Sequence, residues 1–358
     1  MTRDELFDIK IEEPDVNEYK KAKAVFDGIA KPVDGLGYME DIVCRIAAIK
    51  NGLCDISKKA LIVMCADNGV VSEGVSQTDS SVTASVAALL GRNLSTVGVM
   101  TEGYPVEMIP IDVGIDTDEE ITGVRKRKVS KGTGNIAKAC AMSEEQCLKA
   151  IKTGMETVRE CKDRGFGIIA TGEMGIGNTT TSTALFCALT GTVVSEVCGR
   201  GAGLSDKGLR KKIEVIEDSL IFHSLGAITP DAATAFSALC KVGGLDIAGL
   251  CGVFIGAGVC RIPCVIDGAI SAVAALTASY IVPGCEKYML ASHKGREKIT
   301  KEVCDILSLK AVIDADMALG EGTGAVMLFP LLDMVVSVYR NGTRFTDTRI
   351  AQYERFDK

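Results

Sequence analysis

The first segment that could do chemistry is rich in glycine. Residues 171–182 place Gly175 and Gly177 between an apolar run and a predicted helix. Asn178 begins that helix, and Glu173 stands just before the glycines. Glycines let the backbone turn sharply and expose its N–H groups, so the segment predicts an anion site at a helix N-terminus. A plain strand-to-helix turn with a well-capped helix explains the spacing equally well. The segment contains neither GxxxxGK[ST] nor GxGxxG, so it is no Walker A loop or dinucleotide fingerprint.

A second glycine-rich turn, residues 198–206, also precedes a predicted helix. Its Arg200 is a candidate partner for a phosphate or carboxylate, because a guanidinium matches either group with paired hydrogen bonds. The helix that follows carries a basic stretch in which Lys212 is the last residue. For any one of these basic residues a solvated helix face is the simpler interpretation, but one of them could reach back to an anion.

A third segment, residues 315–325, holds a carboxylate between two glycines. Glu321 lies between Gly320 and Gly322, directly before an apolar helix. A carboxylate fixed in such a loop suits a general base. A carboxylate is also simply favourable at the start of a helix, and the spacing alone does not separate the two interpretations.

Several further carboxylates follow apolar runs, but we expect no metal site. No CxxC occurs, the CxxxC of Cys260 and Cys264 has no histidine cluster beside it, and the chain has 2 histidines. We interpret the 14 cysteines as reduced thiols, mostly in the core. The polar candidates in the loop 66–76 and after apolar runs, which we interpret mainly as solvated loop residues and strand-end caps, are Asp67, Glu73, Ser76, Asp112, Asp116, Asp267 and Asp316.

The composition excludes several classes of protein. The chain has 358 residues, of which 47% are hydrophobic and 24% charged, which is typical of a globular protein and excludes a disordered one. A formal net charge of -7 argues against a nucleic-acid partner. The least charged stretch, residues 268–285, contains Gly, Ser, Thr and Pro, so we expect a buried helix and no membrane span. The charged first residues are unlike a signal peptide, and we expect a cytoplasmic protein.

The elements that must position these segments alternate along the chain. Short apolar runs at 60–66, 96–100, 106–113, 166–171, 262–266 and 288–291 alternate with helical patterns such as 81–91, 143–162, 206–222, 269–281 and 323–340. Alternation of this kind predicts an α/β fold with a mostly parallel open sheet flanked by helices, which is Rossmann-like. The helical segment 1–55 and the polar segment 336–358 lie outside the pattern. We expect them to form a small helical subdomain beside an α/β domain at 56–335.

Together the motifs resemble one family closely, the nicotinate-nucleotide–dimethylbenzimidazole phosphoribosyltransferases of cobamide lower-ligand activation. The similar stretches are ADNGV at 66–70 with EGVS at 73–76, GEMGIGNTT at 172–180, GRGAGL at 199–204 and LGEGTG at 319–324. They come in the family's order and span most of residues 60–335.

The resemblance implies a reaction that passes phosphoribosyl from nicotinate mononucleotide to a lower-ligand base, giving an α-ribotide and nicotinate with inversion at C1 of the ribose. It implies no cofactor and no metal, a homodimer and the expected parallel-sheet fold. Glu321 matches the family's catalytic carboxylate, which takes a proton from the attacking base. The resemblance assigns Gly175, Gly177, Asn178, Arg200, Gly201 and Lys212 to the phosphate, Glu173 to the ribose and reacting centre, and Ser76 and Leu319 to the base pocket.

Two positions depart from the family's pattern. Asn68 stands where the family commonly has His, and Ser85 stands where it commonly has a Gln that contacts the base. A hydroxyl in place of that amide leaves a larger base pocket. Benzimidazoles other than dimethylbenzimidazole, adenine and phenolic bases are therefore alternatives, and so is a heterodimer with a paralogue.

Two other classes of function compete with the transferase. One is a non-catalytic nucleotide- or base-binding subunit of the same fold, which the presence of Glu321 argues against. The other is a nicotinamide dinucleotide oxidoreductase, which only the glycine content and the α/β alternation favour.

Overall fold

The computed structural model describes residues 1–52, 55–226 and 230–355. Its main sheet has six parallel strands in the order β3-β2-β1-β4-β5-β6. The strand order reverses between β1 and β4, and sheets of this kind bind ligands at the carboxyl ends of the strands near that point. The predicted parallel α/β sheet is therefore confirmed. Its strands are β1 (Lys59–Ala66), β2 (Val106–Gly114), β3 (Arg125–Lys126), β4 (Ile168–Met174), β5 (Cys264–Ile266) and β6 (Met289–Ala291).

Strand β1 shows why the sheet is covered on both faces. All eight of its residues are buried, and successive side chains of a strand point to opposite faces. Ala60, Ile62 and Met64 accordingly belong to one apolar core, whereas Leu61 and Val63 belong to the other. Each core therefore needs its own layer of helices.

The larger core is covered by helices from the first and the middle parts of the chain. These are α1 (Arg3–Phe7), α6 (Glu144–Asp163), α7 (Asn178–Thr190), α8 (Val194–Val197), α9 (Asp206–Phe222), α10 (Ala232–Val242), α11 (Leu245–Cys260), α12 (Ala269–Ile281) and α13 (Lys298–Ile306). Helix α6 begins after Ser143 with the reciprocal bonds of a capping box to Gln146.

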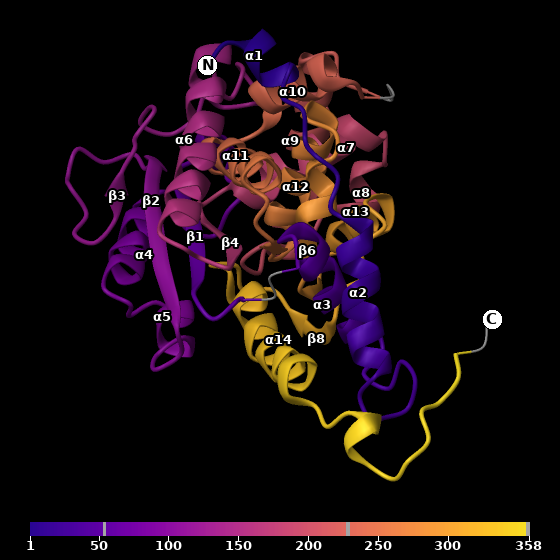
Figure 1. Cartoon of the computed structure of the whole chain (residues 1–358). Helices are drawn as coiled ribbons and strands as arrows, with labels where there is room; N and C mark the ends of the chain where they lie inside the picture. Colours follow the sequence, from indigo (N-terminus) through magenta and orange to yellow (C-terminus); the bar gives the residue numbers. More distant parts are fainter. Residues whose placement is uncertain (53–54, 227–229, 356–358) are drawn as a thin grey trace.

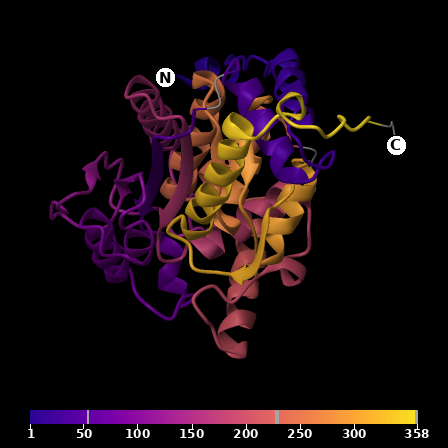
Figure 2. The same ribbon diagram turned by 60° about the horizontal axis from the view of Figure 1, so that its bottom comes forward.

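The second core is covered by α2 (Val16–Asp27), α3 (Tyr38–Ile49), α4 (Ser81–Gly91), α5 (Thr96–Met100) and α14 (Thr323–Asn341). The apolar run 96–100 is thus a short helix and not a strand, and Ser95 caps it by accepting the N–H of Gly98. Figure 2 shows α14, in yellow, beside the strands. The remaining elements are the two-stranded parallel sheet of β7 (His293–Gly295) and β8 (Ile313–Met317) and three short 3₁₀ turns, η1 (Gly69–Glu73), η2 (Cys285–Tyr288) and η3 (Phe345–Asp347).

The apolar stretch 268–285 forms α12, which is almost wholly buried, as expected of a core helix. Two other stretches, residues 81–100 and α14, are long and apolar enough to cross a membrane by length and composition alone. Core helices pass the same test, and half of the α14 stretch is buried in the protein.

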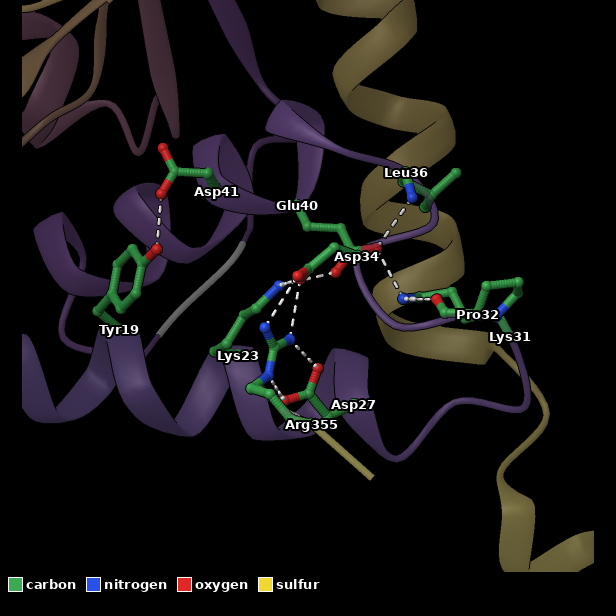
Figure 3. Close-up of polar contacts among 10 residues, drawn as sticks. All are labelled: Tyr19, Lys23, Asp27, Lys31, Pro32, Asp34, Leu36, Glu40, Asp41 and Arg355. Carbon is green, nitrogen blue, oxygen red and sulfur yellow. Dashed lines mark hydrogen bonds and ion pairs between the residues drawn. The ribbon is translucent and has the colours of Figure 1, made fainter. Parts of the chain in front are cut away.

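The C-terminal segment returns to the N-terminal helices (Figures 1 and 3). Ile29 and Arg344 form an antiparallel bridge. The Arg355 guanidinium donates to the Asp27 carboxylate at 2.7 and 3.2 Å and to that of Asp34 at 2.8 and 2.9 Å. Helix α1, by contrast, packs on the larger core, where the Phe7 ring meets the ring of Phe236. The expected division into two domains stays a prediction.

Candidate active site

The three glycine-rich segments meet around one cavity of about 370 Å³. Residues of β4, and those that follow β5 and β6, lie in its wall, so it sits at the carboxyl edge of the sheet. The predicted site residues that line it are Ser76, Glu173, Gly175, Gly177, Asn178, Arg200, Gly201, Leu319 and Glu321.

Lys212 lies beneath the cavity wall and is fully buried. Its Nζ donates to Thr179 Oγ1 at 2.9 Å and to the carbonyl oxygen of Gly199 at 3.1 Å. A Cβ on Gly201, which does line the cavity, would lie 3.7 Å from the same Nζ. Desolvation lowers the pKa of Lys212. An anion bound in the cavity would raise this pKa again and so stabilise the charged form of Lys212. An ammonium group has three N–H donors, so one remains for such an anion.

Ser85 is not brought to the cavity. It is exposed on α4, and its Oγ donates to the carbonyl oxygen of Ser81 at 3.0 Å. Thr83 faces inward instead, and its Oγ1 accepts the backbone N–H of Ile176, within the first glycine-rich segment, at 3.1 Å. A base-contacting role for Ser85 has no support in this arrangement, because its side chain turns back onto its own helix.

Glu173 and Asp246 are two buried carboxylates that share one amide. Asn178 Nδ2 donates to Glu173 Oε2 and, at 3.0 Å, to Asp246 Oδ2. Burial raises the pKa of Glu173 to about 8 and that of Asp246 to about 6, with the Asn178 amide acting in the opposite direction on both. Glu173 is therefore mostly protonated at neutral pH and can donate a hydrogen bond. Asp246 follows the pair Gly243 and Gly244 and was not predicted.

Glu321 sits on a strained turn. Its φ is 59°, and its neighbours Gly320 and Gly322 have φ of 91° and 88°, in the left-handed region that glycine adopts readily. Its Oε2 accepts the backbone N–H of Val97, in α5, at 3.2 Å. The side chain is half-buried.

Asp267 anchors the same turn to the end of β5. One carboxylate oxygen accepts the Gly322 N–H at 3.1 Å and the other accepts the Ala325 N–H at 3.0 Å. Burial raises the pKa of Asp267 to about 6, although these N–H donors act to lower it. The sequence showed Asp267 only as a carboxylate after an apolar run, so its partner was not predicted.

The segments that carry Glu173 and Glu321 approach each other so closely that only glycine fits at two positions, Gly172 and Gly320. A Cβ on Gly172 would lie 2.6 Å from the carbonyl oxygen of Glu321, and one on Gly320 would lie 2.6 Å from Glu173 Oε1. A larger residue at either position would force the two segments apart.

Among the residues that the structure describes, no three His, Cys, Asp or Glu side chains gather as a metal site would require. The cysteines within those residues form no disulfide with one another, and most are buried.

Residues 11–350 of the chain match a phosphoribosyltransferase family model. The nicotinate-nucleotide–dimethylbenzimidazole phosphoribosyltransferase of Ruminiclostridium cellulolyticum is 41% identical over 345 residues, which is 96% of this chain and 97% of the relative. The enzyme of that name from Acetivibrio thermocellus is 41% identical over 329 residues, 92% of each chain. This chain belongs to the nicotinate-nucleotide–dimethylbenzimidazole phosphoribosyltransferase family.

A solved structure agrees with this family in fold. The crystal structure of CobT from Thermus thermophilus superposes with a TM-score of 0.86 at 31% identity, covering 94% of this chain and 100% of the other. The predicted family and the transferase class are therefore confirmed.

Among the residues of this cavity, the sequence predicted those that sit in glycine-rich motifs. It missed Asp246, the anchoring role of Asp267, and His293, which also lines the cavity. Asp267 and His293 follow the predicted apolar runs 262–266 and 288–291, and Asp246 follows a pair of glycines. These local signals do not show which side chains meet at the cavity.

Proposed function

We propose that the chain transfers phosphoribosyl from nicotinate mononucleotide to an aromatic lower-ligand base, releasing nicotinate and an α-ribotide 5′-phosphate. The observation that carries the proposal is that Glu321, a candidate proton acceptor, lines the same cavity as the glycine-rich segment and Arg200. This displacement needs a phosphate site and a proton acceptor within one cavity.

The phosphate is proposed to bind at the start of α7. Gly175, Gly177 and Asn178 line the cavity where that helix begins, and helix N-termini favour anions through their free N–H groups and dipole. Lys212 would supply positive charge from below. Arg200 is exposed, and its guanidinium pairs with Asp206 at 2.5 Å and donates to the carbonyl oxygen of Leu204 at 2.9 Å. A phosphate would replace the exposed ion pair at little cost.

Glu321 is proposed as the general base. An azole N–H is a weak nucleophile, and removing its proton as the C–N bond forms assists attack on C1 of the ribose. Because Val97 holds Oε2, the second oxygen, Oε1, is left for the incoming base. Nicotinate leaves as the pyridinium nitrogen takes the electrons of the breaking bond, so the leaving group itself needs no proton.

Glu173 is proposed to act beside the ribose as a hydrogen-bond donor. Its raised pKa keeps its proton at neutral pH. A neutral acid there also avoids adding a further negative charge to those of the substrate phosphate and Glu321.

The base pocket is proposed to include Ser76 and Leu319, both in the cavity wall. Dimethylbenzimidazole is the first candidate, and another benzimidazole, adenine or a phenolic base remains an alternative. With a phenol, the same Glu321 would remove the O–H proton. Since Ser85 is outside the cavity, base choice is proposed to depend on the residues of the wall.

A homodimer in the cytoplasm is proposed as the working form. Helices α5 and α14 pack on one another, and they and the segment before α5 carry exposed apolar side chains: Leu94, Val99, Met100, Met327 and Met334. Apolar surface of this kind favours association. Light scattering on a sizing column should give about twice the mass of 37.8 kDa; a monomer would refute the dimer, and a requirement for a second kind of chain would favour the heterodimer.

The test of the activity is product analysis by mass spectrometry. The purified chain would receive nicotinate mononucleotide and an equal mixture of dimethylbenzimidazole, benzimidazole, adenine, phenol and p-cresol. Release of nicotinate with one dominant α-ribotide supports the proposal and names the base. No ribotide from any base refutes it for the chain alone and favours a binding subunit.

A further inference from the structure

His293 is a buried histidine that the proposed mechanism does not use. It follows β6, begins β7 and is 4% exposed, yet it lines the cavity. Its ring lies flat over the start of α14, because a Cβ on Gly324 would fall 2.0 Å from Nδ1 and 2.2 Å from Cε1. Only a glycine leaves room for the ring there.

The neighbouring serine fixes which ring nitrogen carries the proton. Ser292 Oγ lies 2.6 Å from the carbonyl oxygen of Ile266 and 2.9 Å from His293 Nδ1. A carbonyl oxygen only accepts, so the single hydroxyl proton of Ser292 goes to Ile266. The serine oxygen must therefore accept from His293, which places the ring proton on Nδ1. Nε2 is left with a free lone pair.

That lone pair opens to the cavity. Within the described part of the chain, Nε2 has no hydrogen-bond partner, and yet the atom is not fully buried. It is therefore reached by solvent. The Nε2–Cε1 edge also faces Gly268, another residue of the cavity wall, whose Cβ would lie 4.0 Å from both atoms.

The segment that carries the ring reaches both ends of the proposed nucleotide site. Gly324, beneath the ring, is three residues after Glu321. Glu297, four residues after His293, reaches the other end, since a Cβ on Gly199 would lie 2.5 Å from its Oε1 and Gly199 accepts a hydrogen bond from Lys212. In a bound nucleotide, the group between the phosphate and the reacting bond is the ribose.

We propose that His293 binds the ribose of the nucleotide substrate by accepting a hydrogen bond from a ribose hydroxyl at Nε2. The inference rests on the proposed function. The chemistry of the substrate supports the choice, because the pyridinium ring and the carboxylate of nicotinate mononucleotide at neutral pH carry no proton to donate. Burial lowers the pKa of His293, which keeps the ring neutral and the lone pair available at neutral pH.

The test compares nicotinate mononucleotide with its 2′-deoxy and 3′-deoxy analogues in the wild type and in His293→Phe. The variant keeps a flat ring over Gly324 but has no acceptor. We expect kcat/KM for the full nucleotide to fall roughly 3- to 10-fold, the size of one hydrogen bond. For the analogue that lacks the hydroxyl bound by His293, kcat/KM should hardly fall in the variant, because the wild type cannot form that hydrogen bond either.

Two further variants keep the proposal testable if His293→Phe does not fold. His293→Gln retains an acceptor and should keep most of the wild-type preference for the full nucleotide. Ser292→Ala frees the ring proton to move to Nε2 and should weaken that preference. Equal losses for the full nucleotide and both analogues, or an unchanged preference in every variant, would overturn the role of His293. A wild type that forms no ribotide would instead refute the proposed function.

Discussion

Asp267 accepts the backbone N–H of Gly322 at 3.1 Å and thereby ties the end of β5 to the turn that carries Glu321. Its other oxygen holds Ala325 in the first turn of α14. A left-handed φ at a non-glycine residue such as Glu321 is unfavourable and persists only where the surroundings hold it. The conformation of the proposed general base therefore depends on a residue from another segment.

Asp267→Asn should loosen that turn. One of the two carboxylate oxygens becomes an N–H donor, which faces another donor. We expect a loss of stability of about 1–3 kcal/mol and a lower kcat with a smaller change in KM for the nucleotide. Denaturant unfolding and steady-state kinetics measure both. Asp218→Asn, at an exposed position of α9, is the control and should change neither; full activity in the Asp267 variant would contradict the anchoring role.

Glu321→Gln should fold normally and bind the nucleotide, because the amide keeps the shape and can still accept from Val97. Turnover should fall roughly 10²- to 10⁴-fold, as for the loss of a general base. Ribotide formation and calorimetric nucleotide binding test the two parts. Near-wild-type turnover would refute the assigned role.

Lys212→Met should weaken the binding of nicotinate mononucleotide more than the binding of the base. The methionine fills most of the buried space and removes the charge. Lys211→Met, at the exposed neighbouring position, is the matched control. Equal weakening of both ligands by the Lys212 variant would count against a phosphate role.

Glu173 should give the protein a pH-dependent stability. Its pKa is about 8 in the folded protein against 4.5 ordinarily, so between these values the folded state holds more protons than the unfolded state. The free energy of unfolding should therefore decrease as pH rises through this window, by at most about 1.4 kcal/mol per pH unit for one proton. Glu173→Gln should flatten that slope above pH 7, where Asp246 and Asp267, each with a pKa of about 6, hold few protons. An unchanged slope would contradict the raised pKa.

Arg355→Ala should release the C-terminal segment from α2. Its two ion pairs are partly exposed, so we expect a loss of only about 1 kcal/mol in unfolding free energy. Faster proteolysis of the segment would accompany it. Arg349→Ala, exposed in the same segment, serves as the comparison. If the two variants behave alike, the pairing of 336–358 with the N-terminal helices loses its support.

The sequence by itself determined the parallel sheet, most helix boundaries and the three glycine-rich segments of the cavity. These are local properties: apolar runs, capping residues such as Ser143 and glycines at turns leave their mark within a few residues of the chain. For the same reason Glu173, Asn178 and Glu321 could be selected before the fold was known.

The tertiary structure alone decided which distant side chains act on those segments. Asp246 reaches Glu173 through Asn178, and Asp267 holds the turn of Glu321. The Ile266 carbonyl oxygen accepts the hydroxyl proton of Ser292 and in this way sets the proton of His293. Each relation joins residues from different elements, and its geometry depends on how the strand ends meet at one edge of the sheet. The fold also leaves one predicted site residue, Ser85, outside the cavity. The packing of α4 on the sheet sets the rotation of that helix, which turns the Ser85 side chain to solvent.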